Sequence, residues 1–135
     1  MVTPEFLKIL VVDDQAVVQK IVYRLLKNIG IGSITQAVDG LEAAQLLATE
    51  KFDAVVCDRH MEGMDGIDLF KTMSTLPQSQ QAPFIMLTGD DSEKAIKEAR
   101  NAGIRWFLKK PCSSASLKRA LEKSLGTFSE PFQSA

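Results

Sequence analysis

The sequence predicts a doubly wound α/β domain, in which five parallel strands form one sheet with helices on both faces. Three observations support this fold class. Short runs of small, apolar and often β-branched residues recur along the chain and are typical of strands that are buried on both faces. Segments with apolar residues at helical spacing alternate with these runs. Most of the apolar runs end directly in polar or charged residues.

Length and composition agree with one compact domain. The chain has 135 residues, of which 45% are hydrophobic and 24% are charged, and this length leaves no room for a second core. The net charge of −1 gives no indication of a nucleic-acid partner or an anionic membrane. We expect a cytoplasmic protein, because no apolar stretch could span a bilayer and residues 1–8 lack a secretory pattern. Cys57 and Cys112 lack metal-ligand spacing and are expected to be buried free thiols.

The first half of the chain contains three predicted strands and two predicted helices. Residues 8–12 form an apolar strand, and apolar residues at three-to-four spacing then indicate an amphipathic helix over 17–29 that Gly30 ends. Residues 33–38 form a shorter and more polar strand. Asp39 is a predicted N-cap with Glu42 three residues later, and it opens a helix that continues to residue 48. Residues 54–57 are small and apolar, as expected of a central strand.

The second half continues the same alternation. A helix over 67–73 ends near Pro77, and residues 78–82 form a polar loop. Residues 84–87 form the fourth strand and residues 106–108 the fifth. Between them, residues 92–102 indicate a helix whose apolar stripe is thin, because it consists of Ala95, Ile96, Ala99 and Ala102. The last helix spans about residues 114–125, and Gly126 lies beyond its end.

These elements divide the chain into three parts. Residues 1–6 are a short N-terminal extension, and residues 7–125 form the predicted domain. Residues 126–135 have few apolar side chains to pack, so we expect a flexible C-terminal tail.

Polar residues follow four of the five predicted strands. They are Asp13 with Asp14, Asp58, Thr88 and Lys110. Because the carboxyl ends of parallel strands meet in one crevice, these side chains are expected to converge there. Clustered carboxylates suit a hard cation such as Mg²⁺, while a lysine and a hydroxyl can hold phosphoryl oxygens. A carboxylate supported in this way can attack phosphorus and form an aspartyl phosphate.

Competing site motifs do not fit. Residues 58–69 resemble part of a calcium loop, but Leu69 stands where the bidentate glutamate is required. A GxxxxGK[ST] phosphate loop and a GxGxxG turn after the first strand are both absent from the sequence. His60 is the only histidine, which excludes a histidine-rich metal site.

Five segments together resemble the receiver domain of bacterial response regulators, which act in two-component systems. They are the sequence ILVVDD at 9–14, CD at 57–58, MDG at 64–66, LTG at 87–89 and KP at 110–111. The resemblance covers about residues 7–125. It implies a flavodoxin-like sheet in the order 2-1-3-4-5, for which the chemotaxis receiver is a standard example. It also suggests a stand-alone, chemotaxis-regulator-like module.

The resemblance implies a phosphorylation site at Asp58. Asp58 would take a phosphoryl group from a phosphohistidine on a sensor histidine kinase or a histidine phosphotransfer protein. Mg²⁺, with Mn²⁺ as a substitute, would be held by Asp14, Asp58 and the main-chain carbonyl of His60, with Asp13 acting through water. One departure is Glu62, which stands where the family usually has proline.

The resemblance also implies catalytic and switch residues. Lys110 and Thr88 would support phosphoryl transfer, and Thr88 with Phe107 would form the switch pair. The Lys110–Pro111 peptide bond would be cis, which only proline commonly permits.

The function implied is a phosphoacceptor signalling module that is not a turnover enzyme. It would bind a downstream protein through the face of helix 92–102, strand 106–108 and helix 114–125, as a monomer or weak dimer without nucleic acid or membrane. One alternative is a phosphatase with an aspartyl-phosphate intermediate, but such enzymes need a second acid where this chain has His60. The other is a receiver fragment of a larger regulator or hybrid kinase.

Overall fold

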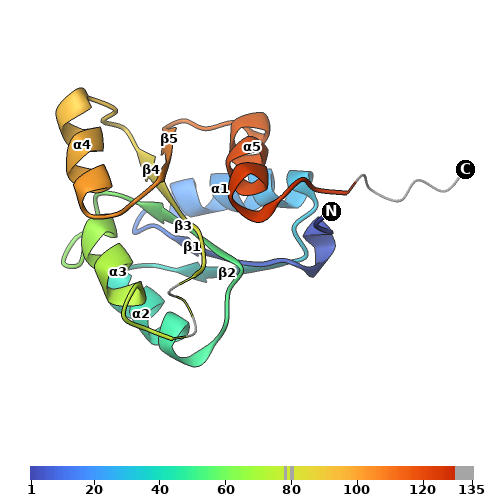
Figure 1. Cartoon of the computed structure of the whole chain (residues 1–135), viewed down its shortest axis with the longest axis horizontal. Helices are drawn as coiled ribbons and strands as arrows, with labels where there is room; N and C mark the ends of the chain where they lie inside the picture. The colour runs from blue at the N-terminus through green and yellow to red at the C-terminus, as the bar shows by residue number, and fades with distance from the viewer. Residues whose placement is uncertain (78, 80, 130–135) are drawn as a thin grey trace, which may run out of the picture.

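The sheet contains five parallel strands in the order β2-β1-β3-β4-β5 (Figure 1). The computed structural model describes residues 1–77, 79 and 81–129. The strands are β1 (Lys8–Val12), β2 (Ser33–Ala37), β3 (Ala54–Asp58), β4 (Phe84–Thr88) and β5 (Trp106–Lys109). The helices are η1 (Pro4–Phe6), α1 (Ala16–Ile29), α2 (Gly40–Thr49), α3 (Gly66–Met73), α4 (Glu93–Asn101) and α5 (Ser114–Leu125). None of the described helices is long and apolar enough to cross a membrane.

The strand order confirms the predicted fold class. The chain moves from β1 outward to β2, returns to β3 on the other side of β1, and then continues to β4 and β5. The winding direction therefore reverses between β1 and β3. In a doubly wound sheet, this reversal opens a crevice at the carboxyl ends of the two strands.

Two apolar clusters cover the two faces of the sheet. Leu10 and Val12 of β1 belong to the cluster that contains residues of α2, α3 and α4. Ile9 and Val11, which point to the opposite face, belong to the cluster that contains residues of α1 and α5. Figure 1 shows α1 with α5 on one side of the strands and α2 with α3 on the other. This double coverage explains why β3 and β4 are buried along their whole length and are continuously apolar before their last residues.

The helix ends follow the signals in the sequence. Asp39 caps α2, because its Oδ1 accepts a hydrogen bond from the Glu42 N–H at 2.8 Å. Gly30 ends α1 in the left-handed region with φ 102°, which glycine adopts without steric cost. Within α1, however, the apolar positions Val17 and Ile21 are 70% and 51% exposed. The helix buries only a narrow stripe, and the spacing of apolar residues does not determine which stripe faces the core.

Helix α4 is attached to the core by small side chains. Only Ala95 and Ala99 are buried, while Ile96 and Ala102 are half-buried. Figure 1 places α4 at the end of the molecule opposite the chain termini. The thin apolar stripe expected from the sequence therefore corresponds to a helix that buries little apolar area. Because buried apolar area supplies most of the free energy of packing, α4 is held weakly against the core.

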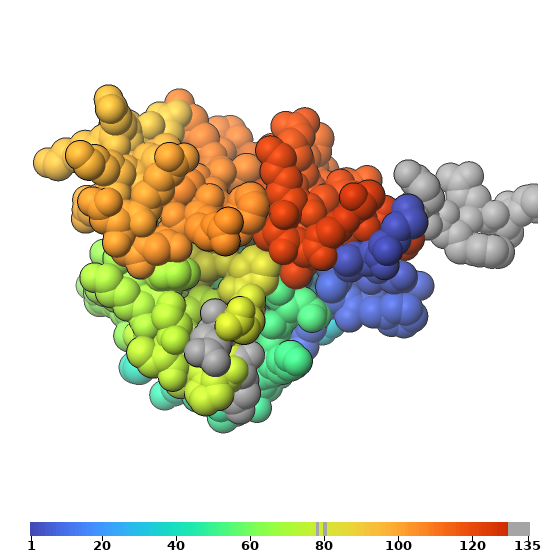
Figure 2. All heavy atoms as spheres, in the orientation of Figure 1, coloured from blue at the N-terminus to red at the C-terminus, as the bar shows by residue number. Residues whose placement is uncertain are grey.

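The segment after α5 is packed, in contrast to the flexible tail expected from residue 126. Phe128 forms a parallel bridge with Val2 and is only 5% exposed. The Val2 N–H donates to the Thr127 carbonyl at 2.8 Å, and the Ser129 N–H donates to the Val2 carbonyl at 2.7 Å. Figure 2 shows the N-terminal segment against the end of α5. Residues 130–135 of the expected tail lie outside the described residues.

We predict that Phe128→Ala lowers the free energy of unfolding by about 3 kcal/mol, because it leaves a cavity between the two terminal segments. Urea denaturation of the mutant and the wild type measures this difference. Phe6→Ala is the matched control, since Phe6 is 80% exposed and its loss should change stability by less than about 0.5 kcal/mol. Equal stability of Phe128→Ala and the wild type would show that this contact does not contribute to the fold.

Candidate functional site

Three carboxylates lie together at the carboxyl ends of β1 and β3. The pairing of these strands places Val12 beside Cys57, so the residues that follow, Asp13 and Asp58, lie side by side at the end of the sheet. Asp14 comes next in the chain. One carboxylate oxygen from each of the three aspartates lies within 4.8 Å of the others. The register of two adjacent strands therefore creates the acidic cluster.

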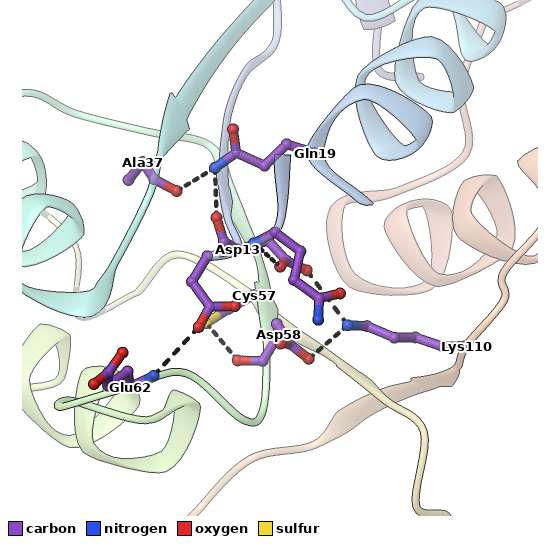
Figure 3. A network of polar contacts seen from close by, with 9 residues as sticks. Asp13, Gln19, Ala37, Cys57, Asp58, Glu62 and Lys110 are labelled. Atoms are coloured by element: carbon purple, nitrogen blue, oxygen red, sulfur yellow. Dashed lines mark hydrogen bonds and ion pairs between the residues drawn. The ribbon is translucent and has the colours of Figure 1, made fainter. Parts of the chain in front are cut away.

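Lys110 reaches into this cluster from the end of β5. Its Nζ lies 2.7 Å from Oδ1 of Asp58 and 3.3 Å from Oδ2 of Asp13 (Figure 3). Its main-chain N–H donates to the Thr88 carbonyl at 2.8 Å, and the Lys110–Pro111 peptide bond is cis. The structure thus brings together four of the residues selected from the sequence: Asp13, Asp14, Asp58 and Lys110.

The charges in this cluster change each other's protonation. Burial raises the pKa of the Asp13 carboxyl, the hydrogen bond from the Gln15 N–H partly offsets the rise, and the charge of Asp58 adds to it. Burial lowers the pKa of the Lys110 ammonium, but the hydrogen bond and charge of Asp58, with those of Asp13, outweigh it and raise the pKa. Lys110 is therefore charged at neutral pH. Three carboxylates face this one ammonium group, which leaves the site attractive to a further cation.

The donor set of the cluster fits a hard divalent cation. It offers carboxylate oxygens from two buried residues, Asp13 and Asp58, and from the exposed Asp14. Mg²⁺ prefers oxygen ligands and keeps several waters, so an acid that faces solvent suits it. The Glu62 N–H also lies 3.4 Å from Oδ2 of Asp14. His60 has an exposed side chain, and the role of its main-chain carbonyl as a ligand stays a prediction.

The hydroxyl of Thr88 is engaged with the loop between β4 and α4. Thr88 is 3% exposed, and its Oγ1 donates to the Asp90 carbonyl at 2.9 Å and accepts from the Asp90 N–H at 3.0 Å. The hydroxyl therefore holds a tight turn just before α4. A new acceptor at Asp58 would compete with the Asp90 carbonyl for this single proton donor.

Phe107, the second residue of the expected switch pair, lies beside α4. It is half-buried on β5, and the Arg100 guanidinium lies 5.8 Å from the centre of its ring. Its neighbour Trp106 is also half-buried, with Arg105 at 5.9 Å from its ring. Both aromatic side chains thus lie under cationic groups at the edge of the sheet.

The two thiols are free, but they differ in burial. Cys57 is fully buried, and its Sγ donates to the Asp58 carbonyl at 3.1 Å. Burial raises the pKa of this thiol well above its usual value, so Cys57 is an unreactive part of the core. Cys112 is half-buried and not buried as expected.

Gln19, which supports the strand ends from α1, was not predicted from the sequence. Its Nε2 donates to the carbonyl of Asp13 at 2.7 Å and to the carbonyl of Ala37 at 2.5 Å (Figure 3). These two bonds satisfy main-chain groups where β1 and β2 separate. The signal was available, because Gln19 lies three residues before Val22 on the buried stripe of α1.

Arg59, which is buried directly after Asp58, was also not predicted from the sequence. Its residue exposure is only 8%, although arginine is seldom buried without a partner. Its side chain contacts α4, at Ala95 and Glu98. A charged residue next to the end of an apolar strand gave no indication of this contact, which depends on residues about 36 positions later in the chain.

Comparisons with known proteins identify the family. The family model described as "Response regulator receiver domain" matches residues 9–122. The chemotaxis protein CheY-3 of Vibrio cholerae is 38% identical over 117 residues, which cover 87% of this chain and 90% of that protein. The chemotaxis protein CheY of Pseudomonas aeruginosa is 34% identical over 117 residues, covering 87% and 94%.

Solved structures agree with the sequence comparison. The receiver domain of the sensor histidine kinase PA1611 from Pseudomonas aeruginosa, with a magnesium ion coordinated in its active site cleft, has a TM-score of 0.82. It is 26% identical, and the match covers 90% of this chain and 98% of that one. The chemotaxis protein CheY4 of Vibrio cholerae also has a TM-score of 0.82, with 28% identity and coverage of 88% and 98%.

We predict that Asp13→Asn stabilises the metal-free protein at pH 7. The raised pKa of Asp13 already includes its attraction to Lys110, so the ionised carboxylate has a net cost in the folded state. This cost is present above the folded-state pKa and disappears below the unfolded-state value of about 3.9. The melting temperature of the mutant should therefore exceed that of the wild type at pH 7, and the difference should shrink as the pH falls to about 3. A lower melting temperature at pH 7 would contradict this account of the site.

Proposed function

This chain belongs to the response regulator receiver domain family, and we propose that Asp58 is its phosphoacceptor. As a receiver, it is a phosphoacceptor signalling module. The observation that carries the assignment is the position of Asp58, which is buried at the end of β3 between two acids and an ammonium group that lies 2.7 Å from its carboxylate. This arrangement supplies a nucleophile and the charges that phosphoryl transfer requires.

The donor would be a phosphohistidine on a sensor histidine kinase or a histidine phosphotransfer protein. A carboxylate oxygen of Asp58 would form a bond to phosphorus while the bond between phosphorus and the donor imidazole nitrogen breaks. The imidazole then leaves with the bonding electron pair. Lys110 would hold the other carboxylate oxygen and then contact a phosphoryl oxygen, and the Thr88 hydroxyl would donate to another. Positioning and charge neutralisation account for most of the rate in such reactions.

Mg²⁺ is the cation that best fits the acidic cluster, and Mn²⁺ is a chemically similar substitute. Asp14, Asp58 and the main-chain carbonyl of His60 would hold it directly, and Asp13 would act through water. When bound, the ion supplies charge neutralisation for the phosphoryl oxygens. The excess of carboxylates over Lys110 supports this proposal, as does the magnesium ion in the active site cleft of the PA1611 receiver.

Phosphorylation would change the loop between β4 and α4. The Thr88 hydroxyl holds Asp90 in this structure, and a phosphoryl oxygen would draw the hydroxyl toward Asp58. The Asp90 turn would then lose two hydrogen bonds, and the Phe107 ring would move inward into the space that the Thr88 side chain leaves. This proposal links the chemistry at the strand ends to the face formed by α4, β5 and α5.

We place the contact with a downstream protein on that face. A groove of about 360 Å³ runs between α4 and α5, with Trp106 and Phe107 of β5 in its wall. The basic side chains among its lining residues are Arg100, Arg105, Arg119 and Lys123, and none of the described lining residues is acidic. A partner segment with acidic and apolar side chains would complement such a groove.

The phosphatase alternative is not favoured. The nucleophile of that enzyme class follows the first strand, whereas Asp58 ends β3, and His60 stands at the position of the second required acid. We propose that the protein promotes its own phosphorylation and slow dephosphorylation without being a turnover enzyme. We further propose that it acts in the cytoplasm as a monomer or weak dimer, and that residues 7–125 are the receiver unit.

We predict that acetyl phosphate with Mg²⁺ adds one phosphoryl group to the wild-type protein. Intact-mass spectrometry should show the addition, and hydroxylamine should remove it because an acyl phosphate is labile. Asp58→Asn should gain no phosphoryl group, since an amide is not a nucleophile of this kind. Asp53→Asn serves as the matched control and should be labelled like the wild type. Equal labelling of Asp58→Asn would move the site elsewhere.

We predict that Mg²⁺ raises the melting temperature of the wild type and that Asp14→Ala loses most of this increase. Mg²⁺ binds the folded state, and at a concentration 100 times its dissociation constant it would stabilise that state by about 2.7 kcal/mol. Thermal unfolding with Mg²⁺ and with EDTA measures the effect. Asp68→Ala removes an exposed carboxylate at the start of α3, and it should keep the Mg²⁺ response. An unchanged response in Asp14→Ala would reject Asp14 as a ligand.

A further inference from the structure

Arg59 is placed between the phosphoacceptor and α4 by a firmly held main chain. Its N–H donates to the Leu87 carbonyl of β4 at 3.0 Å, and its carbonyl accepts from the Gly66 N–H of α3 at 2.9 Å. Asp58 directly precedes it. The backbone that joins these two residues is therefore bonded to the central sheet and to α3, so the origin of the Arg59 side chain has a defined position.

The side chain of Arg59 extends from this position to α4. Nη1 donates to the Ala95 carbonyl at 2.9 Å, and Nη2 forms an ion pair with Oε2 of Glu98 at 3.1 Å. The side chain is 10% exposed. A guanidinium group cannot lose its proton in a protein, and a buried charge without partners is strongly unfavourable. Helix α4 supplies both of these partners, so its position and the burial of Arg59 depend on each other.

The attachments of α4 near the site are few. Its buried apolar side chains are Ala95 and Ala99, which contribute little area. At its N-terminal end, the turn at Asp90 is held by the Thr88 hydroxyl. In the observed position of α4, Thr88 therefore holds the preceding loop while Arg59 holds the helix itself. Both contacts start at the ends of the central strands and stabilise the same arrangement.

We propose that Arg59 is a positioning residue that restrains α4 against the displacement caused by phosphorylation of Asp58. The proposal rests on the proposed function, because it assumes that a phosphoryl group at Asp58 draws the Thr88 hydroxyl away from Asp90. That change releases the loop, but α4 can move only when the bonds from Arg59 to Ala95 and Glu98 also break. Because breaking them costs free energy in the phosphorylated form alone, Arg59 lowers the affinity of the site for a phosphoryl group.

The test measures binding of beryllofluoride, a phosphoryl mimic, by calorimetry in the presence of Mg²⁺. Removing the restraint should tighten binding, so Arg59→Gln is expected to lower the dissociation constant about fivefold. Glu98→Ala removes one of the two partners and should lower it by a smaller factor. Glu93→Ala is the matched control, because it removes the same charge from an exposed position of α4 and should leave the dissociation constant unchanged.

Two further measurements separate restraint from simple structural support. Amide hydrogen exchange in residues 93–101 of Arg59→Gln should be faster than in the wild type before the mimic is added. Arg59→Lys keeps the charge but offers a single ammonium group, so its dissociation constant should lie between those of the wild type and Arg59→Gln. A side chain needed only for folding would give weaker or equal binding when removed, and never tighter binding.

An equal or higher dissociation constant for Arg59→Gln would overturn the proposal. If Arg59→Gln does not fold, the same criterion applies to Glu98→Ala, whose altered residue lies on the exposed side of the ion pair. Binding of the mimic by the wild type distinguishes failure of the restraint proposal from failure of the proposed function. Binding by the wild type with no gain in either variant contradicts the restraint alone, whereas no binding by the wild type contradicts the proposed function as well.

Discussion

The structure depends on the electrostatic balance between three carboxylates and one ammonium group at the ends of adjacent strands. The pairing of β1 with β3 places Asp13 and Asp58 side by side, and Lys110 arrives from β5 to lie against both. A cluster of like charges would destabilise the fold if it stood alone, so Lys110 is needed even before any chemistry takes place. Its single charge does not neutralise the three acids. The remaining negative charge favours the binding of a cation, and it lowers the stability of the metal-free protein.

The rest of the fold divides into a rigid part and a lightly attached part. The strands are covered by helices on both faces, and the strand ends are tied down by contacts such as the two hydrogen bonds from Gln19. Helix α4 is different, because its buried side chains are two alanines, Arg59 forms polar contacts with the helix, and Thr88 holds the loop that precedes it. Elements with little buried apolar area are the ones that move at low free-energy cost. We therefore expect α4, which lies beside the proposed phosphoacceptor, to be the helix that moves most easily.

Polar contacts that cross between elements are consequently more informative about function here than the core is. The core residues would serve any doubly wound sheet, whereas the hydroxyl of Thr88 connects the end of β4 to the loop before α4, and the guanidinium of Arg59 connects the end of β3 to α4 itself. Each hydrogen bond requires a short distance between its donor and acceptor, so it is lost when the two groups move apart. Because such contacts have discrete alternatives, the proposed phosphorylation of Asp58 would be converted into a change of helix position.

The sequence by itself determined the fold class and most of the site. Continuous apolar runs in the sequence indicate the buried strands. The polar residues that end these runs, such as Asp58 and Lys110, meet because the carboxyl ends of parallel strands lie at the same edge of the sheet. Only the tertiary structure shows which residues are the partners of the long Arg59 side chain and of Phe128 near the C-terminus. The contact of Arg59 with α4 and the packing of Phe128 against Val2 join residues far apart in the chain. Local periodicity carries no information about such pairs, because their distance is set by the assembled sheet and not by neighbours in sequence.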